Sequence, residues 1–67
     1  MNDETYAIYN KDLRGYVMGM SYPKREIVCT NNPRIIEYFS TKQRAEIAMK
    51  EFGCDSSYEV VSVRIVH

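Results

Sequence analysis

The chain has 67 residues, of which 45% are hydrophobic and 27% charged, with nine basic against nine acidic side chains. This balance excludes an intrinsically disordered chain, which needs low hydrophobicity and high net charge. It also removes the surplus of Lys and Arg that drives binding to phosphate backbones. The length predicts one domain, residues 1–67, with a small core and little room for a deep substrate cleft.

The N-terminal segment and the apolar runs indicate a cytoplasmic protein. Residues 1–4 are mostly polar and partly acidic, the reverse of a signal peptide, and we expect them to be disordered. The longest apolar runs, such as 27–29, are far shorter than the roughly 20 residues that cross a bilayer. We therefore expect no association with a membrane.

The first half of the chain predicts short strands joined by turns. Residues 6–9 and 16–20 are rich in residues typical of strands and are separated by a polar segment ending in Gly15, which predicts a β-hairpin. A third short strand is expected over 25–30. For residues 33–39 two interpretations stay open: a single helical turn, or an irregular bridge.

Residues 41–52 predict a helix. Ser40 and Gln43 fit a capping box at its start, and Gly53 lies where a left-handed residue would end it. Ile47 should face solvent. One arc of the helix is expected to face the core and carries Thr41, Ala45, Ala48, Met49 and Phe52.

Residues 58–67 are the longest strand candidate. Alternation directs one set of side chains towards the helix in our prediction, namely Glu59, Val61, Val63 and Ile65. The other set points to the opposite face and comprises Tyr58, Val60, Ser62, Arg64 and Val66. The order ββ(β)αβ predicts a small two-layer α+β domain, in which one helix covers one face of a three- or four-stranded, mainly antiparallel sheet.

Catalytic and metal chemistry has few candidates in this sequence. The single histidine, His67, is the last residue, no CxxC occurs, and the three glycines are too scattered for a phosphate-binding loop. Cys29 and Cys54 could form a disulfide, but nothing places the chain in an oxidising compartment, so two reduced, partly buried thiols are predicted. We expect no enzymatic activity, metal, cofactor or small-molecule substrate. A Cys29 with a lowered pKa would favour the alternative of a small enzyme.

Tyrosine is the most unusual feature, with six copies and no tryptophan. Its ring offers apolar area and a polar tip at low entropic cost, which suits binding surfaces. One interpretation places Tyr6 and Tyr16 in or beside the core and explains the other tyrosines by their preference for strands. The other interpretation is a binding surface. The predicted partner-binding patch lies on the sheet face without a helix and consists of Tyr9, Tyr58, Val60, Arg64 and Val66.

An alternative use of the same tyrosines is binding of single-stranded nucleic acid, in which bases stack on aromatic rings. The cations would be Arg14, Lys24 and Arg25, which lie in loops and could gather at one end of the sheet. The balanced charge and the interspersed glutamates argue against this alternative.

Four short segments together resemble a known type of protein. They are 6–10, 14–17, 39–42 with Ala45, and 58–63. Their layout is similar to that of short orphan proteins of bacteriophages, prophages and related mobile elements. The resemblance implies a small protein of unknown function in the host cytoplasm that binds one host protein and modulates it. The hypothesis from the sequence is therefore a non-enzymatic interaction module, docking on a host protein or on a second copy as a homodimer.

Overall fold

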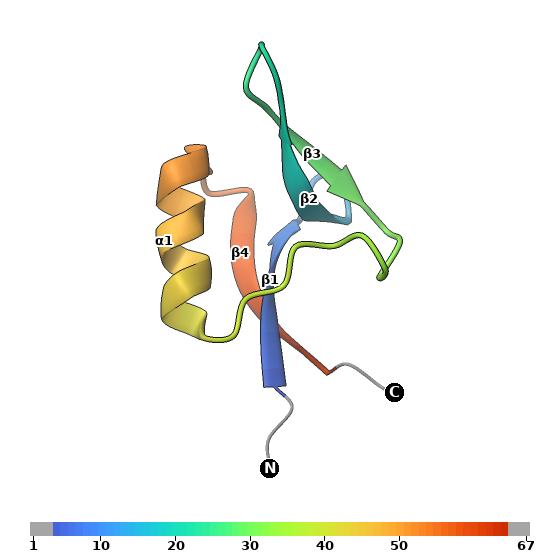
Figure 1. The fold of residues 1–67 in the computed structure, drawn as a ribbon, viewed down its shortest axis with the longest axis vertical. Helices are drawn as coiled ribbons and strands as arrows, with labels where there is room; N and C mark the ends of the chain where they lie inside the picture. Colours follow the sequence, from blue (N-terminus) through green and yellow to red (C-terminus); the bar gives the residue numbers. More distant parts are fainter. Residues whose placement is uncertain (1–3, 65–67) are drawn as a thin grey trace.

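The structure, a computed structural model, describes residues 4–64. These residues form four strands and one helix (Figure 1), in the order β1 (Glu4–Asn10), β2 (Gly15–Ser21), β3 (Glu26–Thr30), α1 (Lys42–Phe52) and β4 (Tyr58–Arg64). The sheet has the strand order β3-β2-β1-β4, and every neighbouring pair is antiparallel. The predicted α+β class and the ββ(β)αβ order are confirmed. Glu4 begins β1, whereas the other residues expected to be disordered lie outside the described range.

The first hairpin is closed by the side chain of Asn10. Its Oδ1 accepts hydrogen bonds from the backbone N–H groups of Asp12 at 2.9 Å and Leu13 at 2.8 Å. Asn10 pairs with Gly15 across a four-residue loop, whose last residue, Arg14, adopts a left-handed conformation with φ 54°. The polar connection predicted from the sequence is therefore a turn that the side chain of Asn10 stabilises.

The second hairpin joins β2 to β3 and extends past the C-terminal end of α1 (Figure 1). The register shifts between Val17 and Gly19, which marks a bulge, and Gly19 has φ 152°. A side chain at position 19 would be strained there by the backbone and not by its neighbours. The loop at the tip ends in Arg25, which is also left-handed with φ 56°.

The segment between β3 and α1 combines the two interpretations left open for it. Residues 33–35 form a turn, and Phe39 then pairs with β1. The N–H of Tyr6 donates to the carbonyl of Phe39 at 2.9 Å, and the N–H of Phe39 donates to the carbonyl of Tyr6 at 2.8 Å. The N–H of Glu37 donates to the carbonyl of Val17 at 3.1 Å. The segment thus bonds to both β1 and β2.

The helix begins one residue later than the capping box predicted. Thr41 is the N-cap, and its hydroxyl accepts a hydrogen bond from the N–H of Arg44 at 3.1 Å. The expected cap at Ser40, with Gln43 bonding back to it, is wrong. Because Thr41 is followed three residues later by Arg44 and not by a Gln or Glu, the reciprocal bond of a capping box has no donor–acceptor pair here.

The helix ends at Gly53, as predicted. Gly53 is left-handed with φ 72°. Its N–H donates to the carbonyl of Lys50 at 3.2 Å, and the N–H of Cys54 donates to the carbonyl of Met49 at 3.0 Å. This pair of bonds is a Schellman motif, which glycine favours because it has no Cβ.

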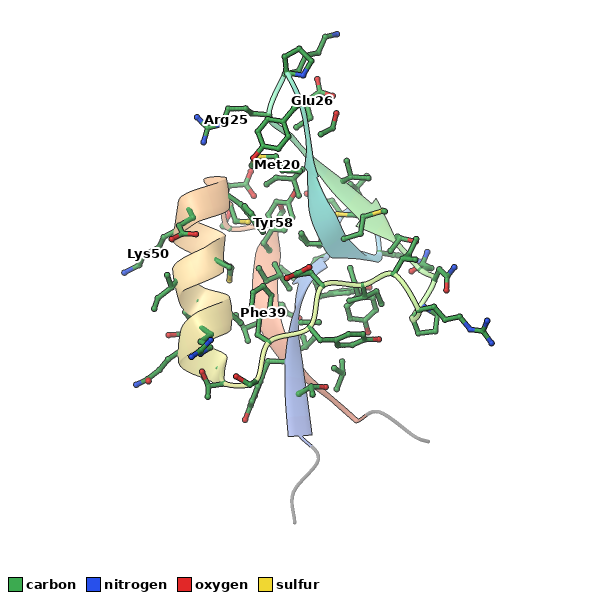
Figure 2. The ribbon with its side chains drawn as sticks, in the orientation of Figure 1. Met20, Arg25, Glu26, Phe39, Lys50 and Tyr58 are labelled. Carbon is green, nitrogen blue, oxygen red and sulfur yellow. The ribbon has the colours of Figure 1, made fainter. Side chains whose placement is uncertain are left out.

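The core lies between α1 and the sheet. Its buried residues are Ile8, Val17 and Ala48, and half-buried side chains pack around them, among them Phe39 and Tyr58 (Figure 2). The others in this layer are Ile27, Cys29, Met49, Phe52 and Cys54. Four of the five positions on the predicted helix arc lie inwards, while Thr41 is exposed at the cap and Ile47 is 57% exposed, as expected.

The predicted orientation of β4 is wrong. Val60 lies opposite Ile8, and Tyr58 packs against the core, so this set of side chains faces α1. Val61 and Val63 lie on the other face. Both faces of β4 are rich in apolar residues, so alternation alone does not fix its orientation. The register with β1 fixes it, and a bond from the N–H of Lys11, after β1, to the carbonyl of Ser57, before β4, continues that register at 2.8 Å.

Candidate functional site

The structure does not bring the predicted partner-binding residues together. Tyr58 and Val60 face α1, whereas Tyr9 lies opposite Glu59 and faces the other side of the sheet. Arg64 ends β4, and Val66 lies outside the described residues. The prediction of one patch made of these residues is therefore corrected: only Tyr9 is shown on the face without a helix.

A pair of tyrosines dominates the face without a helix. Tyr9 and Tyr16 lie opposite each other across β1 and β2, with ring centroids 5.0 Å apart and planes tilted by 59°. This geometry is the tilted arrangement that aromatic pairs favour. Both side chains are half-buried. Tyr16 does not lie in the core between α1 and the sheet, as one interpretation predicted. Val17 points to α1, so its neighbour Tyr16 points to the opposite face of the sheet.

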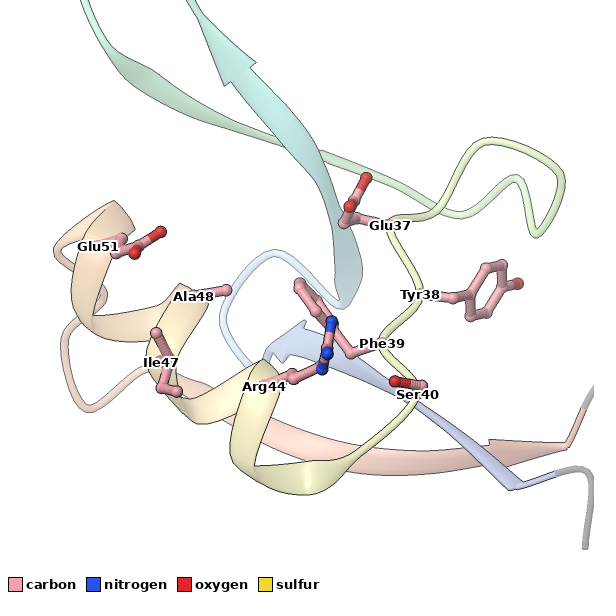
Figure 3. Close-up of a pocket in the computed structure, with 8 residues that line it drawn as sticks. All are labelled: Glu37, Tyr38, Phe39, Ser40, Arg44, Ile47, Ala48 and Glu51. Atoms are coloured by element: carbon pink, nitrogen blue, oxygen red, sulfur yellow. The ribbon is translucent and has the colours of Figure 1, made fainter.

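Tyr38 joins this pair from the segment before the helix. Phe39 pairs with Tyr6 and faces the core, so the residue before it, Tyr38, lies beside Ala7 and points away from α1 (Figure 3). Its hydroxyl donates a hydrogen bond to the carbonyl of Pro33 at 2.7 Å. Ala7 points to the same face and is 0% exposed, although α1 lies on the other side of the sheet. Larger neighbouring side chains on this face must therefore cover it.

Valines complete the surface around these rings. Val61 lies opposite Ala7 and Val63 opposite Thr5, and both are half-buried. The nearest charged position on this face of β4 is the exposed Glu59. We define the tyrosine face as Tyr9, Tyr16, Tyr38, Val61 and Val63. It is mainly apolar, with hydroxyl groups at its tips, as protein-binding surfaces commonly are.

The three cations predicted to gather are separated by the length of β2. Arg14 precedes the first residue of β2, whereas Lys24 and Arg25 follow its last residue. Seven residues in a strand span roughly 20 Å. The prediction that they gather at one end of the sheet is wrong. β2 belongs to both hairpins, so the loop that holds Arg14 and the loop that holds Lys24 and Arg25 lie at its opposite ends.

The two thiols lie in the core layer near the start of β4. Cys29 and Cys54 are half-buried and free, and burial raises the pKa of both. Asp55 and the neighbouring Cys29 raise the pKa of Cys54 further. Burial also raises the pKa of Tyr58, and the side chain of Asn10 opposes that shift. A raised pKa disfavours the nucleophilic thiolate. Cys29 and Cys54 therefore resemble buried structural cysteines more than reactive ones.

A shallow hollow of about 500 Å³ lies between α1 and the segment before it (Figure 3). Phe39 and Ala48 line it together with Ile47, and its charged walls are formed by Arg44 and by two glutamates. The remaining lining residues are Glu37, Tyr38, Ser40 and Glu51. No histidine lines this hollow, so Ser40 lacks the Ser–His pairing that commonly activates a serine nucleophile.

Comparisons with protein-family models, with curated proteins and with solved structures find no match. Within residues 4–64, no helix has the length and apolarity that crossing a membrane requires. Over the same residues, no group of three metal-binding side chains comes together. The tyrosine face is therefore the candidate site on the strength of its own geometry.

Sequence reasoning missed four members of the tyrosine face. Val61 and Val63 were predicted to face the helix, and Tyr16 and Tyr38 were not predicted on this face. Tyr16 could have been found, because a hairpin in which Asn10 pairs with Gly15 puts Tyr9 opposite Tyr16. Tyr38 carried no such signal, because its position depends on the pairing of Phe39 with a strand more than thirty residues earlier in the chain.

Proposed function

We propose that this chain is a non-enzymatic interaction module that docks on a partner protein through the tyrosine face. The observation that carries the proposal is the half-buried pair of Tyr9 and Tyr16 on the sheet face without a helix. Tyrosines that hold each other in place lose little side-chain freedom on binding, and they bury a large area with a polar tip.

The charge of the surface favours protein over nucleic acid as the partner. Single-stranded nucleic acids are bound by aromatic rings with cations beside them. Glu59 is the charged residue next to the tyrosine face on β4. Of the three loop cations, Arg14 alone lies at the end of β2 that carries Tyr16, and Lys24 and Arg25 lie at the other end. A partner protein with an apolar surface and hydrogen-bonding groups at its rim fits this arrangement better.

The resemblance to short orphan proteins of bacteriophages and mobile elements supports a host protein as the partner. A bacterial cytoplasm would then be the place of action. The absence of a low-pKa thiol among the described residues supports binding over catalysis, since burial raises the pKa of Cys29 and Cys54.

Affinity capture from a bacterial lysate tests this proposal with a pair of matched variants. Tyr9→Ser changes the tyrosine face, and Tyr22→Ser makes the same change at a residue that is 74% exposed in the loop between β2 and β3. The immobilised wild-type chain and the Tyr22→Ser variant are expected to retain one protein at similar yield, and Tyr9→Ser is expected to lose it. Equal retention by all three chains, or no retained protein, contradicts the proposal.

Binding to labelled single-stranded oligonucleotides is measured on the same three chains at low and moderate salt. The proposal expects no binding that depends on Tyr9. An affinity that falls steeply with salt and is lost in Tyr9→Ser would instead support the nucleic-acid alternative.

A further inference from the structure

The outer edge of β4 has backbone groups without a partner. β4 is the last strand in the sheet and pairs only with β1. Ser62 lies opposite Tyr6, whose N–H and carbonyl both bond to Phe39 on its other side. Because bonded and non-bonded pairs alternate in an antiparallel ladder, Val60 and Ser62 direct their N–H and carbonyl groups to the outer edge. Within residues 4–64, no backbone group on that side bonds to them.

This edge lacks most of the features that usually prevent strand pairing. Edge strands are commonly protected by Pro, by charged side chains, above all Lys, by a bulge or by short length. β4 has seven residues, Tyr58–Arg64, without Pro, Lys or a register shift; three of them are valines, and its two charged residues lie near its ends. The opposite edge, β3, has five residues, begins at the exposed Glu26, and pairs with β2 across a bulge. The two edges of one sheet therefore differ in their readiness to pair.

We propose that β4 pairs with β4 of a second copy of this chain, antiparallel, about a two-fold axis at Val61. Because only alternate residues direct their backbone groups outwards, this axis bonds Val60 to Ser62 of the partner subunit, and Ser62 to Val60 of the partner subunit. Val61 then lies opposite its own copy. This register pairs all seven residues of β4. An axis at Val60 or at Ser62 would also join outward groups but would leave residues at one end of β4 unpaired.

The charges of β4 permit this register. Its charged residues are Glu59 and Arg64, one of each sign. Glu59 comes opposite Val63 of the partner subunit, and Arg64 comes opposite Tyr58 of the partner subunit. No position therefore sets like charges directly against each other, which would destabilise a cross-strand pair.

The small core favours association, because a domain with few buried side chains gains stability from a second copy. Ile8 and Val17 are its largest fully buried side chains. Domains of this length commonly gain stability from oligomerisation. Pairing at β4 would join two four-stranded sheets into one sheet of eight strands. This pairing uses backbone groups at the edge of β4 and leaves the three tyrosines uncovered. The dimer therefore does not depend on the proposed docking of a host protein, and a host protein could bind to the dimer.

Solution mass tests the inference directly. Light scattering after size exclusion, over a hundredfold range of concentration, is expected to give about twice the chain mass of 7.9 kDa. Ser62→Pro removes an N–H that does not bond to β1, and an edge strand tolerates proline at such a position. We expect it to weaken the dimer by roughly tenfold or more, because each copy loses an intermolecular hydrogen bond. Ser62→Thr keeps the N–H and is expected to remain a dimer.

A disulfide trap tests the register and does not depend on the proline variant. Val61→Cys would place two thiols on residues about 4.5 Å apart at Cα, the spacing of a non-bonded pair, which a disulfide can span. Glu59→Cys is more exposed, but the two copies of that residue would be about 13 Å apart along the strands. We expect rapid oxidative cross-linking of the first variant only.

The results that overturn the inference are equally definite. A mass of one chain at every concentration overturns it, and so does cross-linking of Glu59→Cys as fast as that of Val61→Cys. A dimer that Ser62→Pro leaves unchanged, in a folded protein, also overturns it. If Ser62→Pro fails to fold, the comparison of the two cysteine variants decides. Loss of the dimer in Ser62→Pro with host-protein capture retained would separate this inference from the proposed function.

Discussion

The rings of Tyr9 and Tyr16 lie 5.0 Å apart on the side of the sheet opposite α1. The same two strands point Ile8 and Val17 into the core, so the hairpin that builds the core also fixes the tyrosines. A surface whose side chains are held by their own scaffold loses less conformational freedom when a partner binds. The fold thus couples the stability of the first hairpin to the shape of the candidate site.

The aromatic pair should contribute measurable stability. We expect a coupling free energy of about 0.5–1.5 kcal/mol between Tyr9→Ala and Tyr16→Ala in a double-mutant cycle, as for aromatic pairs in this geometry. Urea unfolding of the wild type, the two single variants and the double variant measures it. A cycle between Tyr9→Ala and Tyr22→Ala serves as the control and should be additive. Additivity in the first cycle as well would show that the two rings do not interact.

Replacing Tyr58 should destabilise the domain. Its ring packs against the core cluster beneath α1, so Tyr58→Ala removes apolar contacts and leaves a cavity. We expect a loss of about 2 kcal/mol in the free energy of unfolding for this half-buried ring. Tyr22→Ala, at a residue 74% exposed, should change stability by less than about 0.5 kcal/mol. A Tyr58→Ala variant as stable as the wild type would mean that this ring faces solvent.

The start of the helix can be located by two alanine substitutions. Thr41→Ala removes the hydroxyl that accepts from the N–H of Arg44, which should cost about 1 kcal/mol in the free energy of unfolding. Ser40→Ala, one residue earlier, should have little effect. Chemical denaturation of both variants provides the test. The opposite ranking would restore Ser40 as the cap.

Arg14→Gly should stabilise the protein. Arg14 has φ 54°, a left-handed conformation that costs a residue with a Cβ about 1–2 kcal/mol. Part of this gain is offset because glycine is more flexible in the unfolded chain, so we expect a net increase of about 0.5–1 kcal/mol. Thermal and urea unfolding measure the change. Arg14→Ala keeps the Cβ and serves as the control, which should show no such increase; equal effects would exclude backbone strain as the cause.

Stability should fall in alkaline solution. Burial raises the pKa of Cys29 and Cys54 above their ordinary 9.0, and also raises that of Tyr58. The folded state therefore holds these protons more tightly than the unfolded state does, and the stability they contribute is lost as pH rises through the raised values. Urea unfolding at pH ~7 and pH ~10 measures the fall. The double variant Cys29→Ala, Cys54→Ala should show a smaller fall, and an identical fall would assign the effect to other groups.

Much of the fold could be predicted because its signals are local. The polar connection ending in Gly15 indicated the first hairpin, and Gly53 indicated the end of the helix. The spacing of Ala45 and Ala48 indicated the inward face of α1. Each of these features depends on residues close together in the chain, where turn chemistry and helical periodicity act directly.

The candidate site could be predicted only in part, because it depends on pairing between distant segments. β4 has apolar residues on both faces, so alternation alone could not decide whether Val60 or Val61 faces the helix. Tyr38 reaches the tyrosine face only because Phe39 pairs with Tyr6. Tyr9 was placed on the correct face, since it alternates with Ile8, the residue that the core requires.

The most direct measurement of the proposed function is the affinity of the captured partner for matched variants. In calorimetric titrations with the purified partner, Tyr9→Ala should weaken binding by roughly tenfold or more, as the loss of an aromatic anchor does. Ile47→Ala, at a residue of α1 that is 57% exposed, should leave the affinity unchanged. Circular dichroism of each variant checks that the fold is retained. An affinity unchanged by Tyr9→Ala and reduced by Ile47→Ala would contradict docking through the tyrosine face and would assign binding to the helix side.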